Sequence, residues 1–193
     1  MVSCPEAFPA PVSFDGPVQA SRLSFDFDSS VPIQFQSKIS AAMDRWASHL
    51  GISAERCAGC ERPDVIRFRF VNGDHGDRFP FDFQTAKVAH VVSSKSDRQA
   101  PEVHFNQQQF PAGSQVAPKI AAPDIYAVAL HEIGHALGLS HSDDPKSIMY
   151  PVYQTGGQII DEELSSQFLV ARFVPPAGEK FQQASLLLSR NRE

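Results

Sequence analysis

Eleven consecutive residues, 131–141, read HEIGHALGLSH and place three histidines, a glutamate and two glycines at fixed spacing. Residues four positions apart on an α-helix lie one turn apart on the same face, so His131 and His135 point their imidazole rings at a common point. His141 comes six residues later, too far along a continuing helix to reach that point. The helix must therefore end in between, and Gly138 is the residue that tolerates the positive φ of a helix end.

Three imidazoles that converge in this way are the protein ligands of a catalytic zinc site, which keeps a fourth position open for water. We therefore expect His131, His135 and His141 to bind zinc. Glu132 directly follows the first histidine, which places its carboxylate beside the metal as a general base that takes a proton from water. Short HExxH patterns also occur by chance on polar helix faces, but the added glycine and third histidine make this pattern far more restrictive.

A methionine follows the third histidine in the segment 147–151, SIMYP. With the histidine motif, this segment resembles the metzincins, a clan of zinc metallopeptidases that carry a methionine turn at this position. The resemblance implies that Met149 packs beneath the three histidines as a soft, apolar floor and is not a ligand. Outside such a motif, a single methionine most often only fills a core.

The upstream chain resembles one branch of this clan, the matrixins, which are the catalytic domains of matrix metalloproteinases. The run 74–82, DHGDRFPFD, is similar to a matrixin segment, and two further histidines follow it in the family's order. The resemblance implies a structural zinc ion bound by His75, Asp77, His90 and His104. Three imidazoles and one carboxylate make a closed tetrahedral set, suited to stability rather than chemistry. The alternative is that these are scattered surface histidines.

The chain departs from the matrixin pattern at the family's structural calcium site. That site uses the aspartate of PFD, carbonyl groups of a glycine-rich loop and two acids after the last structural histidine. Here the aspartate is Asp82, but the loop 83–87 has no glycine, and Asn106 and Gln109 stand at the acidic positions. Because calcium prefers several charged oxygen ligands, we expect this calcium site to be absent or weak.

Hydrophobic periodicity and the resemblance together predict an α+β domain with a matrixin-like catalytic fold: a twisted, mostly parallel, mixed five-stranded sheet, three helices and a Met-turn. Strands are expected at 22–27, at 65–71, through Phe81, at 88–92 and at 103–105. Helices are expected through residues 39–50 with a stop at Gly51, at about 123–137, and from 161–163 onward. Residues 1–20 are expected to form an extended arm, 21–173 the catalytic domain and 174–193 a tail.

Composition excludes several other classes of protein. The chain has 193 residues, 42% of them hydrophobic, which is enough for one compact domain. A net charge of −5 without a cluster of Lys and Arg argues against a nucleic-acid surface, and no apolar run reaches membrane-spanning length. We expect a monomer whose partners are extended peptides or proteins. No secretory signal is visible, so secretion is expected from the resemblance alone.

The three cysteines cannot all pair. Cys57 and Cys60 form a CxxC sequence, for which a short-range disulfide and two plain thiols are the alternatives. Cys4 lies upstream of the first strand at a separation comparable to that of the cysteine that blocks zinc in many matrixin zymogens. Its neighbours lack the family's arginine and glycine, so a Cys4 latch competes with a free thiol on a chain terminus.

The resemblance also suggests how a substrate would bind. In matrixins an extended peptide pairs with an edge strand, which is 88–92 here, so backbone hydrogen bonds would orient it. The S1′ pocket beside the zinc would have Ala127 at its floor and Pro151, Val152 and Tyr153 in its wall. A small floor residue suggests a roomy pocket, and we expect a medium or large apolar P1′ side chain.

Two other interpretations stay open. The first keeps a zinc endopeptidase but assigns another metzincin branch, such as the serralysins or astacins; the second histidine cluster disfavours it. The second is a zinc-loaded binding module that recognises peptides without cutting them. Retention of Glu132 disfavours this module, because metal binding alone does not need that carboxylate.

Overall fold

The computed structural model describes residues 22–81, 87–92, 100–110, 123–153 and 159–160. Its elements, in chain order, are β1 (Arg22–Phe27), α1 (Ile33–His49), β2 (Ser53–Arg56), β3 (Val65–Val71), β4 (Ala89–Val92), β5 (Glu102–Asn106), the 3₁₀ turn η1 (Gln107–Gln109) and α2 (Ile125–Ala136). The third helix expected from 161 onward, the N-terminal arm with Cys4 and the C-terminal tail lie outside the described residues. No helix in the described ranges is long and apolar enough to span a membrane.

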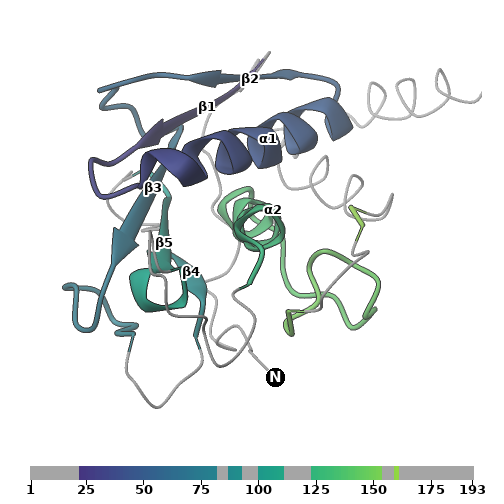
Figure 1. Ribbon diagram of the computed structural model, residues 1–193. Helices are drawn as coiled ribbons and strands as arrows, with labels where there is room; N and C mark the ends of the chain where they lie inside the picture. The colour runs from purple at the N-terminus through teal and green to yellow at the C-terminus, as the bar shows by residue number, and fades with distance from the viewer. Residues whose placement is uncertain (1–21, 82–86, 93–99, 111–122, 154–158, 161–193) are drawn as a thin grey trace, which may run out of the picture.

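The strands form one five-stranded sheet in the order β2-β1-β3-β5-β4, with β2 and β4 at its two edges (Figure 1). The pairs β1–β2, β1–β3 and β3–β5 are parallel, and β4 runs antiparallel to β5. The predicted α+β fold with a mostly parallel mixed sheet is therefore confirmed.

Two details of the strand prediction were wrong. Within the described residues, the segment through Phe81 forms no strand and makes an isolated bridge with Gly73. Pro80 precedes it and cannot donate a ladder hydrogen bond. The fifth strand is instead β2, a short, mostly exposed edge strand. Its sequence, SAER, has no apolar alternation, so the periodicity did not reveal it.

The two described helices lie side by side next to the sheet (Figure 1). Helix α1 buries Ile39, Met43 and Trp46, as the helical spacing predicted, and Gly51 follows its end with φ of 68°. The indole Nε1 of Trp46 donates a 2.8 Å hydrogen bond to the carbonyl oxygen of Leu130 in α2. This buried bond ties α1 to the helix that carries the histidine motif.

Strand alternation separates an apolar face of the sheet from a polar one. Phe68 on β3 lies beside Val103 on β5, and both are completely buried in the core. The intervening residues point to the opposite face, where His90 on β4 lies directly across from His104 on β5. The register of the antiparallel edge pair thus brings two predicted zinc ligands together.

Candidate metal centres

The chain reversal after α2 has the geometry of a glycine C-cap. Gly138 has φ of 95°, its N–H donates to the His135 carbonyl at 2.9 Å, and the Leu139 N–H donates to the Gly134 carbonyl at 3.0 Å. These two bonds make a Schellman motif, which satisfies the last carbonyl groups of the helix. The chain then turns back, and His141 joins His131 and His135 in one group whose ligand atoms lie within 4.8 Å of one another.

Backbone carbonyl groups set the tautomers of the first two histidines in this group. His131 Nδ1 donates to the Ile148 carbonyl at 2.7 Å, and His135 Nδ1 donates to the Leu139 carbonyl at 2.8 Å. Burial lowers the pKa of His131 to about 4 and the pKa of His135 well below its usual value, so both rings are neutral at neutral pH. Each Nε2 therefore presents a lone pair to the centre of the group.

The short distance between two acceptor nitrogens indicates whether a metal ion fits here. The Nε2 atoms of His131 and His135 lie only 3.0 Å apart, and both are acceptors in these tautomers. Two acceptors repel each other unless a cation lies beside them. Three imidazoles are the donor set of a catalytic zinc site, so the residues fit that ion.

Met149 packs against the helix that carries His131 and His135. It is fully buried, and its backbone N–H donates to the Ser147 hydroxyl at 3.1 Å. Its thioether lies against Gly134 of α2: a Cβ at Gly134 would overlap the Met149 sulfur and come within 3.1 Å of the Trp46 ring. The methionine thus reaches the backbone of the histidine helix only because residue 134 has no side chain.

Three further residues predicted for the active site, Glu132, Ala127 and Tyr153, lie on or against the same helix. Glu132 is on α2 directly after His131 and is only 2% exposed. Ala127 is half-buried, one turn before His131. Tyr153 accepts a 2.9 Å hydrogen bond from the Asp124 N–H, which holds the end of the 151–153 segment against the start of α2.

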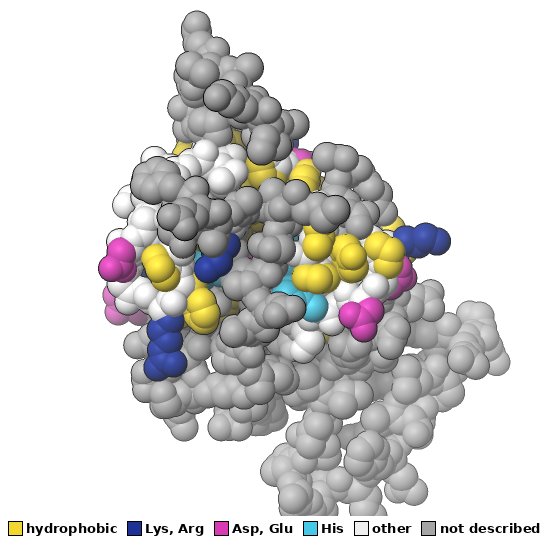
Figure 2. All heavy atoms as spheres, turned by 90° about the horizontal axis from the view of Figure 1, so that it is seen from below, with side chains coloured by type: hydrophobic (Ala, Val, Ile, Leu, Met, Phe, Trp, Pro, Cys, Tyr) yellow, Lys and Arg dark blue, Asp and Glu magenta, His cyan; other side chains and the backbone are white. Residues whose placement is uncertain are grey.

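The histidine group is not sealed from solvent. His131 and His141 each keep part of their surface exposed. Figure 2 shows histidine side chains reaching the surface beside a group of hydrophobic side chains. An approaching molecule would therefore meet both histidine and apolar surface on this face.

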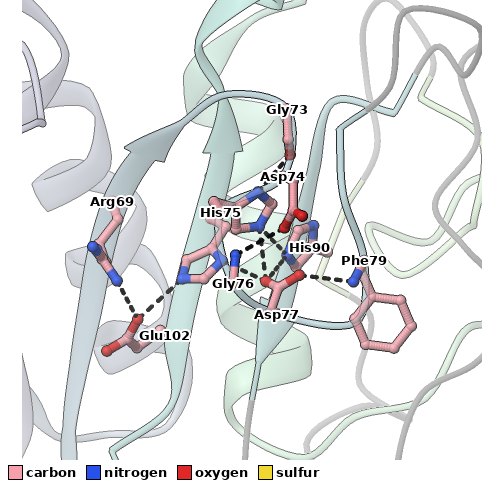
Figure 3. A network of polar contacts seen from close by, with 10 residues as sticks. Arg69, Gly73, Asp74, His75, Gly76, Asp77, Phe79, His90 and Glu102 are labelled. Carbon is pink, nitrogen blue, oxygen red and sulfur yellow. Dashed lines mark hydrogen bonds and ion pairs between the residues drawn. The ribbon is translucent and has the colours of Figure 1, made fainter.

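The second group, His75, Asp77, His90 and His104, converges on one carboxylate oxygen (Figure 3). Asp77 Oδ2 lies 2.8 Å from His75 Nε2, 2.8 Å from His90 Nε2 and 2.9 Å from His104 Nδ1. Burial opposes ionisation of Asp77, but hydrogen bonds from His90 and the Phe79 N–H outweigh it and lower its pKa to about 2. Burial lowers the pKa of His90 to about 4.

As in the first group, hydrogen bonds made by the outer ring nitrogens indicate that a cation fits between the inner ones. His75 Nδ1 donates to the Gly73 carbonyl at 2.9 Å, and His104 Nε2 donates to Glu102 at 3.0 Å. In their neutral forms both rings therefore present lone pairs to Asp77, whose ionised carboxylate is also only an acceptor. Three imidazoles and a carboxylate suit a closed tetrahedral zinc site.

Sequence reasoning missed Glu102 and its partner Arg69. Glu102 lies two residues before His104, on the same face of β5, and this spacing was the available signal. Its carboxylate also accepts a 3.2 Å hydrogen bond from Arg69 Nη1. The hydrogen bond from His104 is the main cause that keeps the pKa of Glu102 below its usual value.

The described part of the expected calcium position does not fit calcium. Asn106 is buried, its side-chain Nδ2 donates to the Lys87 carbonyl at 2.9 Å, and its Oδ1 accepts from the Gln108 N–H at 3.1 Å. An amide group that already uses its donor and acceptor on backbone is a poor ligand for a hard cation. Asp82 and residues 83–86 lie outside the described ranges.

Cys57 and Cys60 are joined by a disulfide bond in the structure, which resolves the two alternatives for the CxxC sequence. The Cys57 N–H donates to the Phe25 carbonyl at 2.8 Å, so the bridge is attached directly beside β1.

Comparison with known proteins identifies the family of this chain. A family model described as matrixin matches residues 20–165, about three quarters of the chain. The chain belongs to the matrixin family. Among its relatives, human matrix metalloproteinase-20 is 33% identical over 134 residues, which cover 69% of this chain and 26% of the relative. Metalloendoproteinase 2-MMP of Arabidopsis thaliana is 34% identical over 141 residues, 72% of this chain and 37% of the relative.

Feline matrilysin is 33% identical to this matrixin over 115 residues, which cover 60% of the chain and 41% of the relative. The chain thus spans well under half the length of each of these three relatives. The family is therefore established for the domain that carries the histidines.

The contact between Met149 and α2 predicts the effect of a methyl group at Gly134. In an unobstructed helix, Gly→Ala stabilises by about 1 kcal/mol. Here Gly134→Ala should destabilise the zinc-loaded protein by about 1–3 kcal/mol, because the new Cβ overlaps the Met149 sulfur. Urea denaturation followed by circular dichroism measures the change. In a Met149→Ala background the destabilisation by Gly134→Ala should be smaller, because the overlapping sulfur is gone. Stabilisation in the wild-type background would contradict the packing.

Proposed function

We propose that this matrixin is a zinc-dependent endopeptidase that hydrolyses internal peptide bonds of proteins. The observation that carries the proposal is the pair of inward-facing Nε2 atoms of His131 and His135 on α2, which lie 3.0 Å apart. The buried carboxylate of Glu132 follows His131 directly. His141 completes a set of three ligands, which leaves one coordination position for substrate or water. The matrixin family membership supports the same activity.

A zinc ion bound by the three histidines would polarise the scissile carbonyl and make water more acidic. The residues of this chain supply the rest. Glu132 accepts a proton from the attacking water and passes it to the leaving amine nitrogen. The carbonyl groups of Ile148 and Leu139 hold the His131 and His135 rings in the tautomers that present Nε2.

His75, Asp77, His90 and His104 bind a second zinc ion that stabilises the loop between β3 and β4. Three imidazole nitrogens within 2.9 Å of one carboxylate oxygen support this role. A zinc ion held by these four protein groups would need no water ligand, so this site would serve stability.

The substrate binds as an extended strand beside β4. This strand is at an edge of the sheet and pairs on one side with β5, and no other described strand pairs with its second side, which suits β-augmentation. Ala127 forms the floor of the S1′ pocket, and Pro151, Val152 and Tyr153 form its wall. The enzyme acts as a monomer outside the cell; the Cys57–Cys60 disulfide supports an oxidising compartment.

A zinc-loaded module that binds peptides without cutting them is the alternative function. Such a module would not need an acid at position 132, because the three histidines bind the metal ion without that carboxylate.

The role of Glu132 predicts a loss of turnover without a loss of metal. Glu132→Gln should lower kcat on a quenched-fluorescent peptide by about 10²–10⁴-fold, because the proton acceptor is gone. The zinc content of the purified protein should stay that of the wild type, since Glu132 is not a ligand. The exposed Glu55, replaced by Gln, is the control. Equal turnover of the Glu132→Gln variant and the wild type would contradict the mechanism.

The small floor of the S1′ pocket predicts its specificity. A peptide library should show preference for medium or large apolar P1′ residues, read from the cut sites by mass spectrometry. Ala127→Phe should lower kcat/KM for long P1′ side chains by about tenfold relative to short ones, since each methylene in an apolar pocket contributes about 1 kcal/mol or more. A preference for charged P1′ residues would refute this pocket.

The hydrogen bonds of Asn106 predict that calcium does not stabilise the fold. The melting temperature of zinc-saturated protein should be the same with millimolar CaCl₂ and with millimolar MgCl₂ as the control for ionic strength. Asn106→Asp should be less stable than wild type by about 1–3 kcal/mol, because the Lys87 carbonyl loses its buried donor. A rise of several degrees with calcium alone would show that the site exists.

A further inference from the structure

Glu102 and Arg69 lie beside the second histidine group but belong to neither donor set (Figure 3). Arg69 on β3 pairs in register with His104 on β5, and Glu102 lies two residues before His104 on the same face. All three side chains therefore share the polar face of the sheet. Glu102 Oε2 accepts from both, at 3.0 Å from His104 Nε2 and at 3.2 Å from Arg69 Nη1.

His104 differs from the other two histidines of the group in the nitrogen that it turns inward. His75 and His90 face Asp77 with Nε2, whereas His104 faces it with Nδ1. A neutral imidazole has one N–H, and only the other nitrogen can bind a metal ion. His104 can therefore serve as a ligand only if its proton stays on Nε2, where Glu102 accepts it.

The outer nitrogens of the three rings differ in their hydrogen-bond partners. His75 donates its Nδ1 proton to the Gly73 carbonyl, a backbone group fixed by the loop. The buried Nδ1 of His90 has no hydrogen-bond partner among the described residues. His104 alone is supported by a charged side chain, which binds more strongly than a neutral acceptor.

We propose that Glu102 is a positioning residue for the structural zinc: it holds His104 in the Nε2–H tautomer and Arg69 holds Glu102. This inference rests on the structural zinc of the proposed function. An ionised acceptor behind a metal-binding histidine raises the basicity of the ligand nitrogen and locks the ring orientation. The Arg69 guanidinium keeps the carboxylate on the outer side of the ring, where it supports the ligand without becoming one.

The matched control is the ion pair between Arg22 and Glu55. It also joins an arginine and a glutamate on neighbouring parallel strands, at 2.7 Å, but across β1 and β2. Glu102→Ala and Glu55→Ala therefore make the same chemical change at a strand pair, and only the first is beside a histidine of the group.

The test measures zinc release from the full, zinc-loaded chain into an excess of a chromogenic chelator. Wild type should release two zinc ions per chain in two phases, and the phase lost in His141→Ala belongs to the catalytic site. Glu102→Ala should speed the other phase by about tenfold or more, the usual effect of removing such a partner. The structural-phase rate of Glu102→Gln should lie between those of wild type and Glu102→Ala, because the carbonyl oxygen of the new side chain still accepts a hydrogen bond from His104. Glu55→Ala should leave both phases unchanged.

The outcomes separate the two proposals. One zinc ion per wild-type chain would overturn the structural zinc and this inference with it. Two zinc ions, with the structural phase of Glu102→Ala and Glu102→Gln at the wild-type rate, would overturn the positioning role alone. A lower melting temperature of Glu102→Ala without faster zinc release would mean that the Glu102–Arg69 ion pair only stabilises the fold, and it would also overturn the positioning role. If Glu102→Ala does not fold, as judged by fluorescence of Trp46, Glu102→Gln carries the test.

Discussion

The convergence of unprotonated imidazole nitrogens at the end of α2 is the constraint on which the rest of this molecule depends. Carbonyl groups of Ile148 and Leu139 hold the rings of His131 and His135 so that their Nε2 atoms lie 3.0 Å apart. This arrangement is unfavourable without a cation and favourable with one. The Gly138 reversal, the buried Met149 and the Trp46 hydrogen bond all stabilise the backbone that creates it.

The second group also brings metal-binding side chains together, but different structural elements supply them. The catalytic set comes from one helix and the turn after it, so local geometry brings it together. The structural set comes from a loop and two strands, and it depends on the register that places His90 opposite His104. Helix spacing is visible in a sequence, whereas strand register is set by tertiary pairing. The first set was therefore derived from spacing, and the second needed the family resemblance.

The errors in the predicted fold have related causes. β2 was missed because its polar residues carry no periodic signal, and it forms by pairing with β1. Phe81 looked like part of a strand because it is apolar, yet it is buried against the rings of His75 and His90 instead. Glu102 was overlooked because sequence inspection searches for ligands, and the groups that orient ligands have no motif of their own.

In this matrixin, Asn106 stands at one of the two positions where the family resemblance predicts an acidic calcium ligand. Asn106 joins the backbone of the segment before β4 to the 3₁₀ turn after β5 through its own hydrogen bonds. A neutral side chain thus links these two backbone segments directly.

Anomalous X-ray diffraction at the zinc absorption edge, from crystals of the purified full chain, tests the account most directly. The account predicts two zinc peaks per chain: one bound by His131, His135 and His141, and one bound by His75, Asp77, His90 and His104. A single peak, or a zinc ion bound by other residues, would contradict it.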